Sequence, residues 1–358
     1  MDFNITLLPG DGVGPEVIDS AVEVLVAVQN RFGHDFNLHR MSIGGAALDA
    51  TGVPLPGETL EDCKYADAIL VGAVGGPKWD NLKPHLRPAK SLSTLRQELG
   101  LIAHLHPAFL HEELVPCCPL RSEVSKKGFD IMVVSETTGG VHRGERGYRD
   151  GSLGQEAFDT EVYSISEIES IAQLAFEFAM TRGKKVTSVD RSDLLETSRL
   201  WRATVDRVAK RYPEVTLRHM HVGLCAIQLI QNPSQFDIIL SPNMYGDIIA
   251  DQATALTGSL CMLSSCSLGA GNKGLYAPIH GAMSGIAGKD EVNPIAAILS
   301  AAMMLSTSLK LVNEAYAIEN AVNKVLARGL RTKDIAAGKR FVSRSRMTEE
   351  IALAVLNG

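Results

Sequence analysis

The chain has 358 residues, of which 45% are hydrophobic and 21% are charged, and its formal net charge at pH 7 is −6. This is the composition of a globular protein long enough for two domains, and the absence of a basic block argues against nucleic acid as a partner. Its apolar runs are shorter than the roughly 20 residues that cross a bilayer, and no basic leader precedes an apolar segment at the N-terminus. We therefore expect a cytoplasmic protein with no membrane partner.

Strand-like apolar runs alternate along the chain with segments of helical periodicity. Strands are expected at residues 4–8, 68–71, 129–134, 185–189 and 237–240. Helices are expected at residues 17–31, 164–182, 197–212 and 293–314, and another follows the strand at 237–240. The alternation predicts an α/β fold with a largely parallel sheet. Residues 144–163 interrupt it with a glycine-rich polar segment, which forms either a β-hairpin arm or an ordered loop.

Two glycine-rich turns each follow an expected strand. The first runs from Gly10 to Glu16 and precedes a helix, so its glycines can let the backbone approach an anion at the helix N-terminus. Its G-x-G-x-G spacing differs from the Rossmann fingerprint. The second runs from Gly75 to Asp80, where loops after parallel strands tend to line a ligand crevice. A purely structural role explains each run about as well as ligand binding does. For the first run that role is a tight strand-to-helix turn, and for the second it is a plain surface turn.

Two aspartates predict a metal site. Asp247 and Asp251 stand in the run N-M-Y-G-D-I-I-A-D, four residues apart, so both carboxylates lie on one face of the expected helix. Like charges at this spacing repel unless a cation lies between them. Mg²⁺ or Mn²⁺ suits that position, because these ions bind few carboxylates and keep waters for a substrate. The alternative is a solvated helix face.

Three histidines form a second candidate site. His104 and His106 alternate along an expected strand, so their side chains share one face. With His142 they would form a new pocket or a metal site. The simpler alternative is that each is solvated or makes a single hydrogen bond.

Several motifs occur in one order along nearly the whole chain. They are the two glycine turns, residues 187–202, the run at 243–251, P-I-H-G at 278–281, I-A-G-K at 286–289 and N-P at 293–294. In these motifs the chain resembles the 3-isopropylmalate dehydrogenases, which are β-decarboxylating dehydrogenases like the isocitrate and tartrate dehydrogenases. The resemblance implies two α/β domains sharing a long mixed sheet, with no Rossmann fold. The cofactor-side domain would comprise residues 1–100 and 258–358, and the metal, substrate and dimerisation domain residues 101–257.

The same resemblance implies a homodimer held by helices and by an arm at about residues 144–163. Each active site would borrow groups from the partner. The implied reaction is hydride transfer from a 2-hydroxy acid to NAD or NADP, followed by loss of a β-carboxylate as CO₂. Mg²⁺ or Mn²⁺ on Asp247 and Asp251 would polarise the reacting oxygens.

The chain departs from the family pattern where this chemistry is expected. The family's catalytic lysine, in a run like V-D-K-A-N, is replaced by Arg191, which stays protonated and is a poor proton shuttle. In the same run Asp193 replaces the asparagine on the nicotinamide side. Gly223 replaces the third metal carboxylate, and His142 replaces a tyrosine. Arg191 and His142 therefore stand at the catalytic positions.

The binding positions are also altered. Arg96 matches the first of three substrate arginines, and His106 and Ser135 replace the other two. Each lost charged hydrogen bond to a carboxylate costs about 1.5–3 kcal/mol, so dicarboxylate binding is expected to weaken. Gly285 replaces the aspartate that grips the ribose, which leaves NAD and NADP both open. The positions that match the family's cofactor site are Gly75, His280, Gly281, Ala287 and Asn293.

Three functions follow from this mixture. The first is a member of the family repurposed to a non-standard small anionic substrate, which it oxidises as a 2-hydroxy acid, decarboxylates, or both. The second is a catalytically inactive paralogue with a binding or regulatory role. An ordinary 3-isopropylmalate dehydrogenase of leucine biosynthesis ranks third, because loss of a proton-transfer group alone is worth about 10²–10⁴ in rate.

Overall fold

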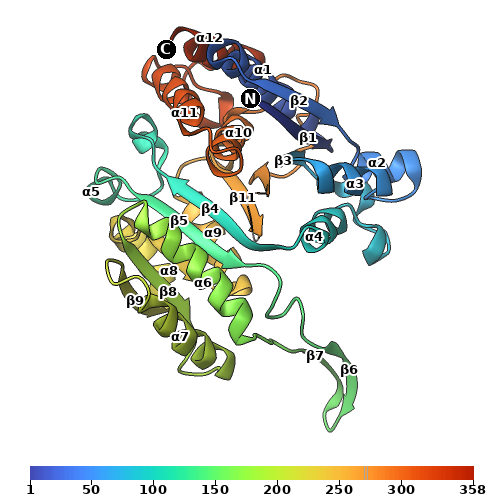
Figure 1. Cartoon of the computed structure of the whole chain (residues 1–358), viewed down its shortest axis with the longest axis vertical. Coiled ribbons are helices and arrows are strands. Elements are labelled where there is room, and N and C mark those ends of the chain that lie inside the picture. Colours follow the sequence, from blue (N-terminus) through green and yellow to red (C-terminus); the bar gives the residue numbers. More distant parts are fainter. Residues whose placement is uncertain (270, 272) are drawn as a thin grey trace. The chain divides into compact units, whose positions relative to one another are not determined.

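The computed structural model describes residues 1–358 except Ala270 and Asn272 (Figure 1). The chain divides into two compact units. Unit one comprises Met1–Leu101, His111–Cys118 and Thr257–Gly358, and unit two comprises Ile102–Leu110 and Pro119–Leu256. Within the described residues, no helix combines the length and the apolarity needed to cross a membrane.

One short segment lies outside the expected division. Residues 111–118 fall inside the predicted second domain, but the structure assigns them to unit one. The reason is their hydrogen bonding: the ring of His111 bonds to Asn323 at 2.9 Å, and Arg331 donates to the carbonyl of Glu113 at 3.2 Å. These partners are distant in sequence, so no local pattern indicates them.

Unit one is an α/β unit built on the strand order β2-β1-β3-β12-β11. The pairs β1–β2, β1–β3 and β3–β12 are parallel, and β11–β12 is antiparallel. Its strands are β1 (Asp2–Gly10), β2 (Asp35–Arg40), β3 (Ala68–Ala73), β11 (Ser264–Gly269) and β12 (Gly274–Pro278). Its helices are α1 (Gly14–Phe32), α2 (Gly44–Thr51), α3 (Gly57–Tyr65), α4 (Ala89–Glu98), α10 (Ile295–Thr307), α11 (Val312–Ala327) and α12 (Arg344–Asn357).

Unit two has the strand order β4-β5-β10-β8-β9 and a separate hairpin. The pair β4–β5 is antiparallel, and β5–β10, β10–β8 and β8–β9 are parallel. Its strands are β4 (Leu101–Phe109), β5 (Asp130–Glu136), β6 (Arg146–Gly151), β7 (Gly154–Asp159), β8 (Lys185–Asp190), β9 (Thr216–His221) and β10 (Ile238–Ser241). Its helices are α5 (Ser122–Ser125), α6 (Ile165–Met180), α7 (Glu196–Ala209), α8 (Val222–Gln231) and α9 (Asn243–Ala255). The predicted α/β class with a mixed sheet is confirmed.

Helix α1 illustrates why the local pattern works in unit one. Val17, Ala21, Val24 and Val28 recur at helical spacing and are fully buried. A proline occupies the first turn, where its missing N–H costs nothing, and Gly33 ends the helix with φ 73°. Burying each valine is worth about 1.5–2 kcal/mol, so the predicted helix is held by one continuous apolar face.

The helix predicted over residues 293–314 is wrong in its length. It is two helices, because α10 ends at Thr307 and α11 begins at Val312. Between them Lys310 takes a left-handed conformation, with φ 59°, and the N–H of Leu311 bonds to the carbonyl of Leu305 at 2.8 Å. Apolar residues on most sides of this segment hide the break, because periodicity cannot separate two helices that are both buried.

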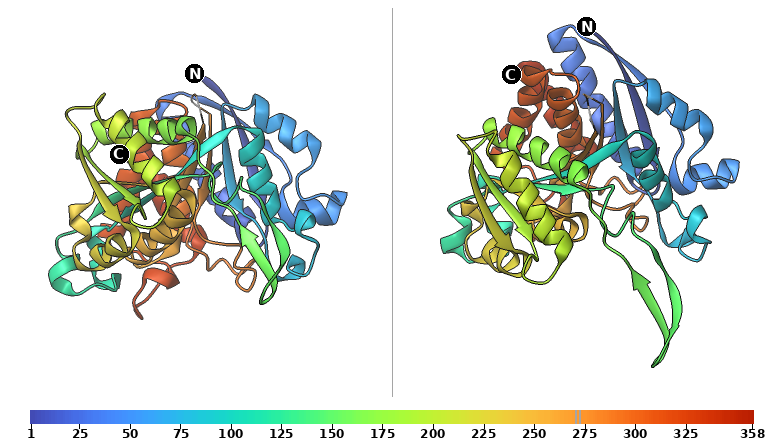
Figure 2. Two further views of the ribbon diagram at one scale, coloured as in Figure 1. Left: turned by 90° about the horizontal axis from the view of Figure 1, so that it is seen from below. Right: turned by 60° about the horizontal axis from the view of Figure 1, so that its bottom comes forward.

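Residues 146–159 form an antiparallel β-hairpin, β6 and β7, which decides between the two readings of the glycine-rich segment. The hairpin extends away from the helices of unit two (Figure 2). Arg149 pairs with Glu156 across the strands at 2.8 Å and stacks over Phe158. Tyr148 and Leu153 are 75% and 98% exposed. A polar hairpin with such exposed apolar side chains is a surface suited to contact with another molecule.

Candidate active site

The predicted metal ligands lie on α9 of unit two. Strand β10 ends at Ser241, and α9 begins two residues later, so Asp247 and Asp251 stand one turn apart and are exposed. In the described part of the chain, no three His, Cys, Asp or Glu side chains form a group that could hold a metal. The pair itself fits a hard divalent cation, since such ions accept one or two carboxylates and complete their shell with water and substrate oxygens.

A buried network that sequence analysis missed fixes the start of α9. The side-chain amide of Asn243 donates to the carbonyl of Gly139 at 2.7 Å, and its backbone N–H donates to the hydroxyl of Tyr163 at 3.0 Å. Glu136, only 1% exposed, accepts from Thr138 at 2.6 Å and from Gly139 at 2.9 Å. Burial raises the pKa of Tyr163, which keeps its hydroxyl neutral. The run E-T-T-G-G at 136–140 is the sequence signal of this turn.

Arg191 is paired within its own loop. Its guanidinium donates to both carboxylate oxygens of Asp193, at 3.2 and 3.3 Å. These hydrogen bonds lower the pKa of Asp193. His221, at the end of β9, places Nδ1 3.9 Å from the same carboxylate. The cluster therefore holds a fixed cation, an ionised carboxylate and an imidazole.

The strand before this loop ends in a buried ion pair that sequence analysis also missed. Asp190 is fully buried and accepts from Arg202 through two hydrogen bonds of 2.9 Å. It also accepts from the N–H of Ser192 at 3.0 Å. The pair ties the end of β8 to α7, and so it holds the loop that carries Arg191.

Gly223 lies in the first turn of α8 and is exposed. A Cβ added there meets no heavy atom within 4 Å. The backbone therefore does not require glycine at this position, and an acidic side chain would fit.

The structure brings some of the predicted substrate residues together. His104 and His106 share a face of β4, with ring centroids 4.0 Å apart, as expected. Ser135 pairs with His104 in the antiparallel register of β4 and β5. His142 is exposed in the segment before the hairpin. Arg96 belongs to α4 of unit one, where its Nε donates to Ser267 at 3.0 Å.

Three loops of unit one converge around the first glycine turn. The buried carboxylate of Asp11 accepts from the backbone N–H groups of Gly45, Ala46 and Gly75 at 2.7–2.8 Å. The N–H of Val13 donates to the carbonyl of Ala282 at 2.8 Å. The two glycine turns that sequence analysis weighed separately therefore form one structure, and Asp11 is the residue that joins them.

Replacing Asp11 with alanine is expected to destabilise unit one by about 3 kcal/mol, because three N–H groups around it lose their charged acceptor. Chemical denaturation of the purified variant measures this loss. Asp80→Ala is the control, since Asp80 is exposed near the same loops and should change stability by less than about 0.5 kcal/mol. Equal effects of the two substitutions would contradict the role given to Asp11.

The predicted cofactor positions lie beside these loops. His280 is 4% exposed, and burial lowers its pKa, so its ring is neutral. Nδ1 lies 3.0 Å from the carbonyl of Gly281 and must therefore carry the proton. Nε2 is then a buried acceptor that has no partner within the described residues. Such an orphaned acceptor fits a ligand that brings a donor, such as an amine or a sugar hydroxyl.

The remaining cofactor positions divide into open and occupied ones. An added Cβ at Gly75, Gly281 or Gly285 meets nothing within 4 Å, so the surface is open there. Ala287 is half-buried in the following turn. Asn293 is buried. Its side-chain Nδ2 donates to the carboxylate of Asp334 at 3.1 Å, and its Oδ1 accepts from the backbone N–H of Ile295 at 3.0 Å. Its side chain therefore anchors the start of α10.

Comparison with known proteins adds whole-chain evidence to this geometry. The family described as isocitrate/isopropylmalate dehydrogenase matches residues 4–351. A protein named 3-isopropylmalate dehydrogenase from Geobacillus kaustophilus is 51% identical over 99% of this chain and 96% of its own length. Another of that name from Haemophilus influenzae is 50% identical over 99% of both chains.

Solved structures agree with the fold. The isocitrate dehydrogenase from Methylococcus capsulatus superimposes with a TM-score of 0.85 at 29% identity, covering 99% of both chains. A β-decarboxylating dehydrogenase from Thermococcus kodakarensis gives a TM-score of 0.83 at 32% identity, covering 99% of this chain and 96% of its own. The family match spans nearly all of the chain, and the chain belongs to the isocitrate/isopropylmalate dehydrogenase family.

Proposed function

We propose that this protein is a 3-isopropylmalate dehydrogenase, which oxidises the hydroxyl of 3-isopropylmalate with NAD⁺ and releases a carboxylate as CO₂. The observation that carries the proposal is the identity of 50–51%, over 99% of the chain, to proteins of that name. Identity at this level, over nearly the whole chain, extends far beyond the motifs.

The order of functions drawn from the sequence was therefore wrong. It placed a repurposed enzyme first and an ordinary 3-isopropylmalate dehydrogenase last. Relatives that are about half identical over their full length overturn this order. The error arose because a few replaced positions, such as Arg191 and Gly223, were weighed more heavily than the other residues of the chain.

Asp247 and Asp251 are proposed to hold the divalent metal, Mg²⁺ or Mn²⁺. Their exposure and their spacing of one helical turn support this role. When bound, the metal polarises the hydroxyl and carbonyl oxygens of the substrate. The buried bonds of Asn243 support the function indirectly, since they fix where the helix carrying both carboxylates begins.

His280, Gly281, Ala287 and the loop at Gly75 are proposed to bind NAD, which accepts the hydride. The orphaned Nε2 of His280 and the open surface at the glycines support this assignment. Gly285 brings no basic group that would favour the 2′-phosphate of NADP, so NAD is the proposed cofactor.

Arg96, whose Nε donates to Ser267, is proposed to bind a substrate carboxylate, because the planar guanidinium matches the geometry of a carboxylate. His106 and Ser135 are proposed to contribute further hydrogen bonds to the substrate. His142 is exposed just before the hairpin and is proposed to contact the substrate.

The proposed assembly is a homodimer formed through α8, α9 and the hairpin. Leu224, Ile227 and Ile230 on α8 are 44–53% exposed at helical spacing. Met244 and Ile248 on α9, which packs beside α8, are 46% and 58% exposed. Apolar faces of this kind on adjacent helices support an interface that a second copy would cover.

The test is a direct assay of the purified protein with 3-isopropylmalate, NAD⁺ and Mg²⁺, following NADH by absorbance and CO₂ by release. Isocitrate serves as the control substrate, since solved relatives include isocitrate dehydrogenase. Formation of NADH with 3-isopropylmalate at least about tenfold faster than with isocitrate is expected. Absence of NADH, or a preference for isocitrate, would refute the proposal.

Arg191→Lys is expected to raise kcat by about tenfold or more with little change in KM, because a lysine can exchange a proton whereas a guanidinium cannot. Steady-state kinetics of the two proteins measure the difference. Arg211→Lys is the control, because Arg211 is an exposed arginine just after the adjacent helix and pairs with Glu169. An unchanged kcat in Arg191→Lys would mean that the proton leaves through another group, such as the imidazole of His221.

A further inference from the structure

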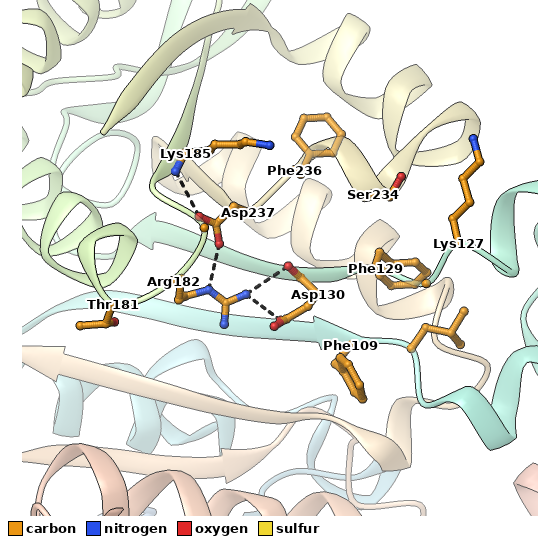
Figure 3. Close-up of a pocket in the computed structure, with 13 residues that line it drawn as sticks. Phe109, Lys127, Phe129, Asp130, Thr181, Arg182, Lys185, Ser234, Phe236 and Asp237 are labelled. Carbon is orange, nitrogen blue, oxygen red and sulfur yellow. Dashed lines mark hydrogen bonds and ion pairs between the residues drawn. The ribbon is translucent and has the colours of Figure 1, made fainter. Parts of the chain in front are cut away.

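Unit two contains a cavity of about 770 Å³ (Figure 3) that none of the proposed catalytic or cofactor residues line. This volume lies within the usual range of small-molecule sites, roughly 300–1,000 Å³. Its walls are the end of β4, the turn before β5, the turn between α6 and β8, and the turn before β10.

The cavity lies at the amino ends of the parallel strands of unit two, whereas the metal ligands follow the carboxyl end of β10. Strands β5, β8 and β10 are parallel, and the cavity is lined by residues at their amino ends, including Asp130, Lys185 and Asp237. Glu136, Asp190 and Ser241 stand at the carboxyl ends of the same strands. Six residues of extended chain span roughly 16–20 Å. The cavity is therefore separate from the proposed active site.

An ion-pair network forms the polar wall of the cavity. Arg182 lies between two carboxylates, with Nε donating to Asp237 at 3.1 Å and Nη2 donating to Asp130 at 2.6 Å (Figure 3). Asp237 also accepts from the N–H of Lys185 at 3.1 Å. Both acidic groups thus accept hydrogen bonds from the protein, and the one guanidinium leaves the network with a net charge of one negative unit.

Two lysines outweigh the single negative charge that remains on this network. Lys127 and Lys185 line the cavity and are exposed, and neither ammonium makes an ion pair within the described part of the chain. Counting the two lysines and Arg182 against the two aspartates leaves a net charge of one positive unit. An anion would be attracted to this site.

The other wall is apolar and aromatic. Phe129 and Phe236 are each 5% exposed and give the cavity a rigid base. Phe109 is 42% exposed and also lines the cavity, as does Leu110. Sites of this composition bind ligands with an apolar body and a few polar groups that fix their orientation.

We propose that this cavity binds a small organic carboxylate with an apolar or aromatic body. The positive charge of Lys127 and Lys185 attracts the carboxylate, and the apolar body lies on the side of the cavity that Phe109, Phe129 and Phe236 line. This inference goes beyond the proposed dehydrogenase function and does not depend on it, because the cavity contains none of the residues proposed for catalysis.

Isothermal titration of the full-length protein with phenylacetate, inorganic phosphate and phenethylamine tests the proposal. Phenylacetate carries both features, phosphate has only the anionic charge, and phenethylamine has the aromatic body with the opposite charge. Binding of phenylacetate at least about tenfold tighter than either of the others is expected. Equal binding of phosphate and phenylacetate would overturn the apolar part of the proposal, and binding of phenethylamine in preference would overturn the anionic part.

The Lys127→Ala/Lys185→Ala double variant locates the binding. Its affinity for phenylacetate is expected to fall about tenfold, while turnover with NAD⁺ stays within about twofold of the parent. Lys126→Ala is the matched control, because Lys126 is an exposed lysine adjacent to Lys127 that does not line the cavity. Unchanged phenylacetate affinity in the double variant would place the binding elsewhere and overturn the site. These titrations measure binding without turnover, so they remain decisive if the proposed dehydrogenase activity fails its own test.

Discussion

Mn²⁺ is expected to bind Asp247→Ala at least about 100-fold more weakly than the parent protein. The substitution removes one of two carboxylates that stand one turn apart, and a single carboxylate holds a divalent ion poorly because the site loses both charge and a ligand. At a fixed Mg²⁺ concentration, turnover is expected to fall about 10²–10³-fold, since the reacting oxygens lose their electrostatic stabilisation. Titration of free Mn²⁺ by electron paramagnetic resonance measures the binding directly.

The control for this experiment is Glu123→Gln. Glu123 is an exposed carboxylate of unit two on the short helix α5, away from α9 in sequence. The substitution Glu123→Gln removes one negative charge from the same unit and leaves the proposed ligands unchanged. Unchanged Mn²⁺ affinity in Asp247→Ala, or an equal loss in Glu123→Gln, would mean that the pair on α9 is a solvated helix face.

Arg202→Met is expected to destabilise unit two by about 3 kcal/mol. Asp190 is fully buried, and among the residues that the structure describes the substitution leaves its charge with only the N–H of Ser192 as a close donor. Removing one partner of a buried pair costs roughly 3–5 kcal/mol, and the lower end applies because the side chain of Arg202 is 33% exposed and water can partly replace it. Urea denaturation of both proteins measures the difference.

Two variants sharpen this result. Arg211→Met lies just after α7 and breaks an exposed pair with Glu169, so it should cost less than about 1 kcal/mol. The double variant Asp190→Asn/Arg202→Met removes the buried charge with its partner and should recover part of the lost stability. Equal losses in the two single variants would show that the ion pair at Asp190 does not hold the end of β8.

The sequence located those features that depend on residues close to one another in the chain. The spacing of Asp247 and Asp251 places them on one helix face whatever surrounds that helix. The apolar stripe of α1, the glycine-rich turns and the short strands were likewise readable, because helix and strand periods are local properties. The order of motifs was enough to indicate the family, and the whole-chain comparison agrees.

The same local reading misjudged the function. It treated Arg191 and Gly223 as evidence against the ordinary enzyme, although the remaining residues of the chain resemble that enzyme closely. The structure places Arg191 in a bidentate pair with Asp193 and leaves open space at Gly223. The kinetics of Arg191→Lys measure how the first of these positions affects turnover.

By itself, the sequence determined the α/β class, most of the elements and the pair of carboxylates on α9. Only the tertiary structure revealed Asp11 as the acceptor that joins two glycine turns, Asp190 as a buried partner of Arg202, and the unsatisfied nitrogen of His280. It also separated α10 from α11 and formed the cavity around Arg182. The physical reason is the same in each case. A buried polar group must find its partner wherever the fold brings one, and that partner is often distant in the chain.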